Sequence, residues 1–233
     1  MRKFSLVVIA VLACTVLSEA ATPRTLTRTV PVDSVEALDL ASGIGDVKVI
    51  ARDGLDDVAI EVTLTPRRGG FFSSKRQAEQ DVQAASLKAK VKGNKLVIGI
   101  DPPADDERRF EERWTIEMPA NIELKLNHGV GDISIQGVRA GLEIDSGVGD
   151  IEAKIAEGDI TIDLGVGTAV ITGPADAYAS AEGAGGVGDA RLTIRGEKIS
   201  SGGFVSHAAS WSGNGAHHIE VSVGIGDAVI TLD

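Results

Sequence analysis

Alternation of apolar and polar residues runs through most of the chain, and it recurs around a short glycine-containing phrase. Before each phrase the apolar residues fall on even offsets from a central aliphatic residue, and after it they fall on odd offsets. Period-two alternation predicts a β-strand with one buried face. The change of parity indicates that one residue is used in a turn, so that both flanking strands point the same side inward. The phrase is Gly-x-Gly, usually followed by Asp, and its central residues are Ile44, Val130, Val148, Val166, Val187 and Ile225.

The copies follow one another at a nearly regular distance, which predicts a repeat architecture. From Val130 to Ile225 the successive separations are 18, 18, 21 and 38 residues, and the longest is about two periods. Such a period is typical of stacked repeats that share a continuous core. We therefore predict an all-β protein with one short helix, built as a β-solenoid, a single-stranded β-helix of stacked repeats of about 18–21 residues. The central aliphatic side chains are expected to lie in a buried column.

The turn residues are predicted to have a structural role. Glycine adopts a positive φ without steric cost, and two glycines around one residue allow a sharp bend. An aspartate in such a turn can accept hydrogen bonds from nearby backbone N–H groups. The residues assigned to these turns are Gly43, Gly45, Asp46, Gly129, Gly131, Asp132, Gly147, Gly149, Asp150, Gly165, Gly167, Gly186, Gly188, Asp189, Gly224, Gly226 and Asp227.

Residues 21–126 are predicted to form a first module, and residues 127–233 the Gly-x-Gly-Asp repeat region that continues from it. Alternating apolar residues predict strands over 35–40, 47–50, 58–64 and 114–118, and a hairpin over 87–100. Ser74 followed three residues later by Gln77 is typical of a helix start, and predicts one short helix over 75–85. The charged, proline-containing run 101–112 predicts a solvated loop.

The first twenty residues have the organisation of a signal peptide. A positive start with Arg2 and Lys3 precedes an apolar stretch, and a small-x-small site ends at Ala20. Cleavage there predicts an exported protein of the periplasm or cell surface, with no transmembrane helix in the mature chain. Lipidation at Cys14 is the alternative to ordinary cleavage. Because Cys14 is the only cysteine, cleavage would leave no disulfide and no thiolate ligand.

The charge of the chain excludes some partners. The formal net charge is −11, and from Asn127 onward there are five basic and fifteen acidic residues. An acidic surface repels nucleic acid and anionic lipid, so we expect neither as a partner. Charge of one sign also favours solubility and opposes edge-to-edge association of strands.

The phrases SGIGDVKV, HGVGDISI, SGVGDIEA and GIGDAVIT, with the alternation around them, resemble the bacterial putative-adhesin family of repeat domains of unknown function. The resemblance covers essentially all of the chain after the signal peptide. It implies an adhesin-like β-helix in an exported protein of the bacterial envelope. It implies no catalytic mechanism, because the family label reflects fold and not a site.

Cofactor and metal chemistry finds little support in the sequence. Calcium binding along a ridge of turn aspartates is one alternative, because stacked carboxylates repel unless they are hydrogen-bonded or bridged by a cation. The glycine-rich run 183–188 precedes a strand and not a helix, so it lacks the phosphate-binding arrangement. His217 and His218 alternate across a strand and cannot readily share one ion. We therefore predict no cofactor and no metal, with a calcium-stabilised solenoid as the alternative.

A carbohydrate-active β-helix enzyme is the rival function. Its acids could be Asp145 with Asp150, or Asp159 with Asp163. These acids occupy ordinary strand and turn positions, whereas a catalytic pair would mark a unique break in the repeat. We therefore assign no catalytic residue.

Binding surfaces are the remaining candidates. Phe71 and Phe72 lie in a loop rich in glycine and basic residues, and Trp211 and Tyr178 could stack on a sugar. These four residues are the predicted binding residues. The sequence therefore predicts a non-catalytic, adhesin-like structural or interaction module that binds an envelope protein or a glycan.

Overall fold

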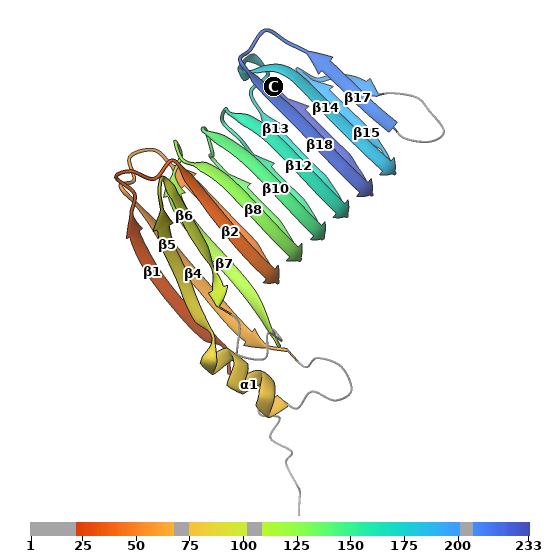
Figure 1. The fold of residues 1–233 in the computed structure, drawn as a ribbon. Coiled ribbons are helices and arrows are strands. Elements are labelled where there is room, and N and C mark those ends of the chain that lie inside the picture. The colour runs from red at the N-terminus through yellow and green to blue at the C-terminus, as the bar shows by residue number, and fades with distance from the viewer. Residues whose placement is uncertain (1–21, 68–74, 102–108, 201–206) are drawn as a thin grey trace, which may run out of the picture.

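The computed structural model describes residues 22–67, 75–101, 109–200 and 207–233, and within them the fold is all-β with one α-helix. The strands form two large sheets that lie face to face (Figure 1). Helix α1, Lys75–Ala84, lies at the end of the molecule beside the antiparallel strands, where it contacts the ten-stranded sheet. No described helix is long and apolar enough to cross a membrane. The predicted signal peptide and the Phe71–Phe72 pair lie outside the described residues.

The ten-stranded sheet joins the first module to the repeat region. In spatial order its strands are β1 (Arg24–Pro31), β4 (Asp57–Pro66), β7 (Phe110–Pro119), β3 (Val47–Arg52), β9 (Ile133–Gln136), β11 (Ile151–Lys154), β13 (Ala169–Gly173), β19 (Ala228–Leu232), β15 (Ala190–Ile194) and β16 (Glu197–Ser200). The pairs from β7 to β15 are parallel, whereas β1–β4, β4–β7 and β15–β16 are antiparallel.

The nine-stranded sheet has the same design. In spatial order its strands are β17 (His207–Ser212), β14 (Tyr178–Val187), β18 (His217–Ile225), β12 (Asp159–Val166), β10 (Gly141–Val148), β8 (Glu123–Val130), β2 (Ala37–Ile44), β6 (Lys95–Asp101) and β5 (Ser86–Lys92). Antiparallel strands lie at both edges, and the six pairs between them are parallel. A single 3-10 turn, η1 (Ala175–Ala177), leads into β14.

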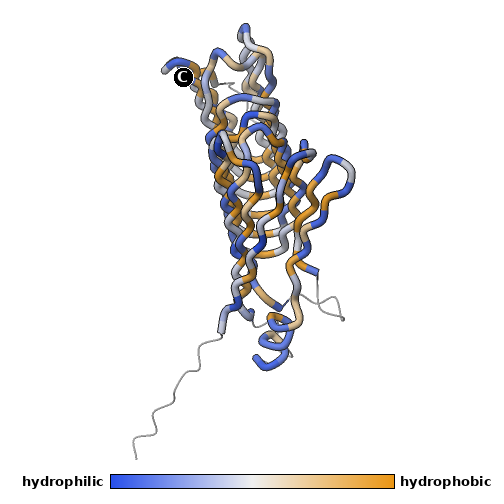
Figure 2. Tube along the Cα trace, turned by 90° about the vertical axis from the view of Figure 1, so that its left-hand side faces the viewer, coloured by the Kyte–Doolittle hydropathy of each residue, from blue (hydrophilic) through white to orange (hydrophobic). Residues whose placement is uncertain are grey.

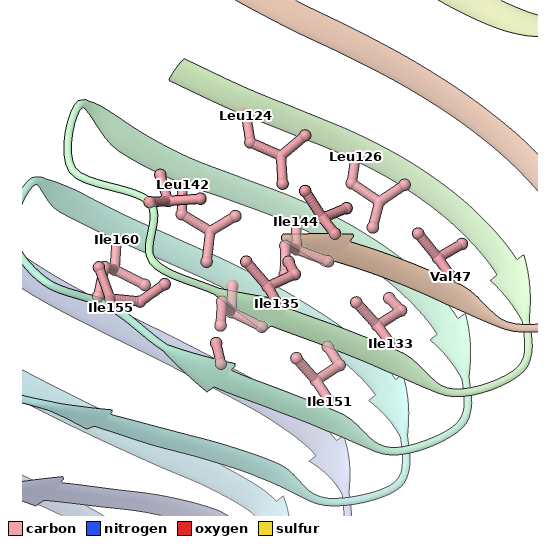
Figure 3. Packing of buried hydrophobic residues seen from close by; sticks show 14 of the residues in the cluster. Val47, Leu124, Leu126, Ile133, Ile135, Leu142, Ile144, Ile151, Ile155 and Ile160 are labelled. Atoms are coloured by element: carbon pink, nitrogen blue, oxygen red, sulfur yellow. The ribbon is translucent and has the colours of Figure 1, made fainter. Parts of the chain in front are cut away.

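The core lies between the two sheets, and the alternation of the sequence accounts for it. Each Gly-x-Gly turn connects a strand of the nine-stranded sheet to one of the ten-stranded sheet. Leu124 and Leu126 of β8 and Ile133 and Ile135 of β9 therefore all point into the space between the layers (Figure 3). Hydrophobic and hydrophilic positions alternate along the visible described strands (Figure 2). The change of parity at the turn thus directs both flanking strands inward, as predicted.

The prediction of a β-solenoid is wrong, because the strands form two mixed sheets in an order that a solenoid would not give. A solenoid adds each coil beside the preceding one. Here β18 lies between β12 and β14, and β19 lies between β13 and β15, so the last strands enter between earlier ones. Antiparallel strands at the edges make both sheets mixed. The repeated pattern specifies which face is buried and the pairing register, but equivalent copies do not specify which one becomes the neighbour.

The prediction that the central aliphatic residues are buried is also wrong. Five of them are between 41% and 68% exposed, and Ile44 is half-buried. The reason lies in the glycines beside them. A Cβ built on Gly129 would lie 2.4 Å from the carbonyl oxygen of Gly43, and one built on Gly131 would lie 2.0 Å from that of Gly45. The backbones of neighbouring turns pack so closely that the intervening side chain points outward.

Candidate functional site

A groove of about 820 Å³ lies on the outer face of the ten-stranded sheet. It crosses the parallel strands β7, β3, β9, β11 and β13 near the turns that precede them. The residues that line it include two cations, two hydroxyls, a carboxylate and a valine: Lys48, Arg113, Thr115, Ser134, Glu152 and Val170. All of these residues except Arg113 lie in one row, because each is paired in register with the next across the sheet: Thr115, Lys48, Ser134, Glu152 and Val170.

Three turn aspartates, Asp46, Asp132 and Asp150, line one side of the groove, and backbone N–H groups hold their carboxylates. We call Asp46, Asp132, Asp150, Asp227 and Asp189 the aspartate ladder. The N–H of Asp150 donates to Asp132 Oδ1 at 3.0 Å, and the N–H of Thr168 donates to Asp150 Oδ1 at 2.8 Å. At the far end the N–H of Asp189 donates to Asp227 Oδ1 at 3.0 Å. Asp132, Asp150 and Asp227 thereby cap the turn of a neighbouring strand, the role in which a turn aspartate is favoured.

Arginines neutralise the two ends of the aspartate ladder. The Arg113 Nε lies 3.7 Å from Asp46 Oδ2, and Arg191 lies 2.7 Å from Asp189 and 3.1 Å from Asp227. The hydrogen bond that Arg191 donates to Asp189 raises the pKa of the Arg191 guanidinium above its ordinary value. Over the described part of the chain, no group of three or more His, Cys, Asp or Glu side chains could hold a metal ion. The backbone hydrogen bonds to these carboxylates offset the electrostatic repulsion between neighbouring aspartates.

The turn glycines have the backbone geometry that the motif demands. Gly149 has a φ of +142°, and a Cβ built on it would lie 1.9 Å from the carbonyl oxygen of Gly131. No side chain fits at that distance, so the close approach of successive turns requires glycine here. The second glycine of every other copy has the same sign of φ: Gly45, Gly131, Gly167, Gly188 and Gly226.

A buried polar cluster lies between the sheets, directly behind the first turns. Glu112 is 1% exposed, and its Oε2 accepts hydrogen bonds from Trp114 Nε1 at 2.9 Å and from Ser42 Oγ at 3.3 Å. The N–H of Gly43 donates to the same oxygen at 3.3 Å. The prediction of a solvated loop ending at Glu112 is therefore wrong at its last residues, since β7 begins at Phe110. The alternation of Phe110, Glu112 and Trp114 was the signal for a strand.

His128 lies next to this cluster and is also buried. It is paired in register with Ser42 on one side and Ser146 on the other, and neither ring nitrogen completes a hydrogen bond with the described residues. Burial lowers the pKa of His128, while the Gly131 backbone and the charges of Glu112, Asp46 and Asp132 oppose this shift. The Ser42 hydroxyl donates to Glu112 and not to His128. The geometry is thus not that of a serine–histidine nucleophile.

Two of the predicted aromatic binding residues, Tyr178 and Trp211, lie in the core or against it. Tyr178 is fully buried, its hydroxyl lacks a hydrogen-bond partner among the described residues, and burial raises its pKa to about 12. Trp211 is partly exposed on β17, where it lies in register with Ala181 and packs against the core. The structure gives both rings a packing role and does not bring them together with the groove. Ligand binding through Trp211 stays a prediction.

Comparison with known proteins identifies the fold. No family model and no curated protein matches the chain. Among solved structures, a putative cell adhesion protein from Clostridium sporogenes is similar with a TM-score of 0.58 and 17% sequence identity. The similarity covers 91% of this chain and 100% of that one. A putative adhesin from Bacteroides fragilis is 12% identical over 89% of this chain and 97% of its own, with a TM-score of 0.32.

These similarities assign a fold and not an activity. At 17% identity the Clostridium protein shows only that the two chains share an architecture. The Bacteroides protein is too distant, at its TM-score, to support any conclusion. The resemblance to adhesins seen in the sequence is thus supported at the level of fold, whereas a Gly-x-Gly-Asp β-helix is not.

Proposed function

We propose that this chain is a non-catalytic, adhesin-like interaction module of an exported cell-envelope protein, and that its groove binds a protein or glycan partner. The observation that carries the proposal is the fixed polar edge of the groove. Carboxylates held by backbone hydrogen bonds are pre-organised, so little conformational entropy is lost when a ligand binds them. Hydroxyls and cations in the same row supply the mixed donors and acceptors that glycans and polar peptides use.

The rival function, hydrolysis or elimination on a polysaccharide, is less well supported by the same geometry. A catalytic acid needs an environment that raises its pKa above that of its partner. The acids proposed for such an enzyme, Asp145 with Asp150 and Asp159 with Asp163, are instead all exposed on strands and turns. The structure buries none of them in a setting that would separate an acid from a base.

A pair of matched substitutions tests the groove. Ser134 is half-buried in β9 within the groove, and Ser222 is half-buried in the parallel strand β18 on the outer face of the other sheet. Ser134→Gln and Ser222→Gln add the same uncharged bulk to the two faces. Partners would be sought by glycan array and by capture from an envelope fraction, with urea unfolding to confirm that both variants fold.

The expected result is a loss of binding only in the groove variant. Ser134→Gln should raise the Kd for the captured partner about tenfold, the effect of losing one well-packed contact region. Ser222→Gln should leave this Kd unchanged. Binding that survives Ser134→Gln would remove the groove from the proposed function. Turnover of a polysaccharide by the wild-type protein would replace the proposal with the enzymatic alternative.

A further inference from the structure

The exposed central residues of the turns form a continuous apolar line along one edge of the molecule. Their strands are neighbours, and register pairing places each residue directly beside the next. Strands lie about 4.8 Å apart, so six of them give a line about 24 Å long. We call this line the aliphatic ridge; its residues, in spatial order, are Ile44, Val130, Val148, Val166, Ile225 and Val187.

Folding alone does not account for the aliphatic ridge. Within the described ranges, five of the six exposed large hydrophobic side chains belong to it, and the sixth is Val91. Apolar side chains gathered in one exposed line, and not scattered singly, are typical of interaction surfaces. A β-branched residue suits the end of a strand, but threonine would serve that purpose as well as valine. Every copy nevertheless has valine or isoleucine.

The charge beside the aliphatic ridge indicates the chemistry of its partner. An aspartate of the ladder follows two residues after the ridge residue in five of the six turns, and Thr168 takes that place after Val166. The ends of the aspartate ladder are paired with Arg113 and Arg191, but no cation of the described residues forms an ion pair with Asp132 or Asp150. Their outer carboxylate oxygens are therefore available to basic side chains next to Val130 and Val148. A second copy of this chain would bring a like-charged ladder and is disfavoured.

The spacing of the ridge selects a helix over an extended strand. Three intervals, from Val130 to Ile225, span about 14 Å at the strand spacing. Three turns of an α-helix rise about 16 Å. In an extended strand alternate residues share a face, and three such two-residue steps span about 20 Å. Only the helix keeps its apolar side chains close to successive ridge residues over this length, with i, i+3, i+4 and i+7 positions on one face.

We propose that the aliphatic ridge and the central aspartates are a docking surface for a basic, amphipathic α-helix of a partner protein. The helix lies along the ridge with its apolar face on the valines and with lysine or arginine against Asp132 and Asp150. This inference rests on the proposed function as an interaction module and names a partner class for the edge beside the groove.

A synthetic helix provides the probe. An 18-residue peptide with leucine on one face and lysine along its flank would be titrated against the purified protein by fluorescence anisotropy. A second peptide carries glutamate in place of every lysine. The expected result is binding of the lysine peptide that weakens with added salt, and no binding of the glutamate peptide.

Two variants separate the apolar and the charged contributions. The first is the triple variant Val130→Thr/Val148→Thr/Val166→Thr, which keeps the shape and strand preference of the side chains but adds hydroxyls. It should raise the Kd for the lysine peptide at least about tenfold. Asp132→Asn/Asp150→Asn keeps each Oδ1 as the acceptor of its backbone hydrogen bond and removes only the charge, so it should reduce the salt dependence. Urea midpoints close to wild type would show that both variants remain folded.

The outcomes that overturn the inference are distinct from those that overturn the proposed function. Equal affinity of the threonine variant for the lysine peptide, or no binding by the wild type, would exclude a helix dock. Concentration-dependent self-association that the threonine variant abolishes would assign the ridge to a second copy. Valine-dependent binding to zwitterionic vesicles would assign it to lipid. If the threonine variant keeps its affinity for both the lysine peptide and the captured partner, while Ser134→Gln loses the captured partner, the groove function stands and the ridge inference falls.

Discussion

Replacing Gly149 by alanine should be among the most destabilising single-methyl changes in the repeat region. The new Cβ would lie 1.9 Å from the carbonyl oxygen of Gly131, whereas real Cβ contacts essentially never fall below 3.0 Å. The two turns must therefore separate by about 1 Å. That movement disturbs the hydrogen bonds from Gly131 N–H to Val148 at 2.9 Å and from Gly149 N–H to Val166 at 3.0 Å.

The size of the effect follows from two contributions. A side chain forced to a positive φ of this kind costs about 1–3 kcal/mol. Two weakened backbone hydrogen bonds cost about 1 kcal/mol each. The free energy of unfolding should therefore fall by about 4 kcal/mol, which for a chain of this size lowers the Tm by about 8–16 °C.

Gly54→Ala is the matched control for this prediction. Gly54 also has a positive φ, +78°, but a Cβ built there meets no atom within 4 Å. Only the backbone strain applies, so the expected cost is about 1–2 kcal/mol. Urea unfolding followed by circular dichroism would measure both variants. If Gly149→Ala and Gly54→Ala lower the free energy of unfolding equally, close backbone packing is not what the turn glycines provide.

Three further predictions concern the buried polar groups. Wild-type stability should fall as the pH drops below about 6.5, because burial lowers the pKa of His128 in the folded protein while the unfolded chain still takes up a proton there. The variant His128→Ser has the residue of its register neighbours, and its urea midpoint should fall less as the pH drops. A variant with the same pH profile as the wild type would contradict this prediction. Trp114→Phe removes a hydrogen-bond donor to Glu112 and should cost about 2–3 kcal/mol in urea unfolding, and a loss below about 1 kcal/mol would show that the contact contributes little. Asp81→Asn breaks the largely buried ion pair with Arg109, 2.9 Å long, and should lower the free energy of unfolding by about 2–4 kcal/mol, whereas an unchanged Tm would show that the pair stabilises little.

The buried faces of the strands could be predicted from the sequence, and the reason is local. Leu142 and Ile144 before a turn, and Ile151 and Ala153 after it, alternate with polar residues and are all buried. A strand has a period of two whatever its neighbours, so alternation specifies its inner face directly. The turn that carries the chain from one sheet to the other was visible in the same way, as a change of parity.

Burial of polar residues could not be predicted in this way. His128 occupies an inward position that serine occupies in two other copies, and a partly exposed site was expected. Glu112 was expected in a solvated loop. Their burial depends on partners distant in the sequence, such as Ser42, which lies 70 residues from Glu112. A hydrogen bond between such distant groups leaves no periodic trace in the sequence.

In the repeat units the sequence by itself determined the strands before and after each turn, their inner faces and the turns between the two layers, because these depend on residues that are neighbours in the chain. The tertiary structure decided the order of the strands, since near-identical copies such as those around Val166 and Ile225 are equally good neighbours by pattern. It also decided that the recurring valines face the solvent. Their direction depends on how closely one glycine turn packs on the next, and that contact joins residues 18 or more positions apart.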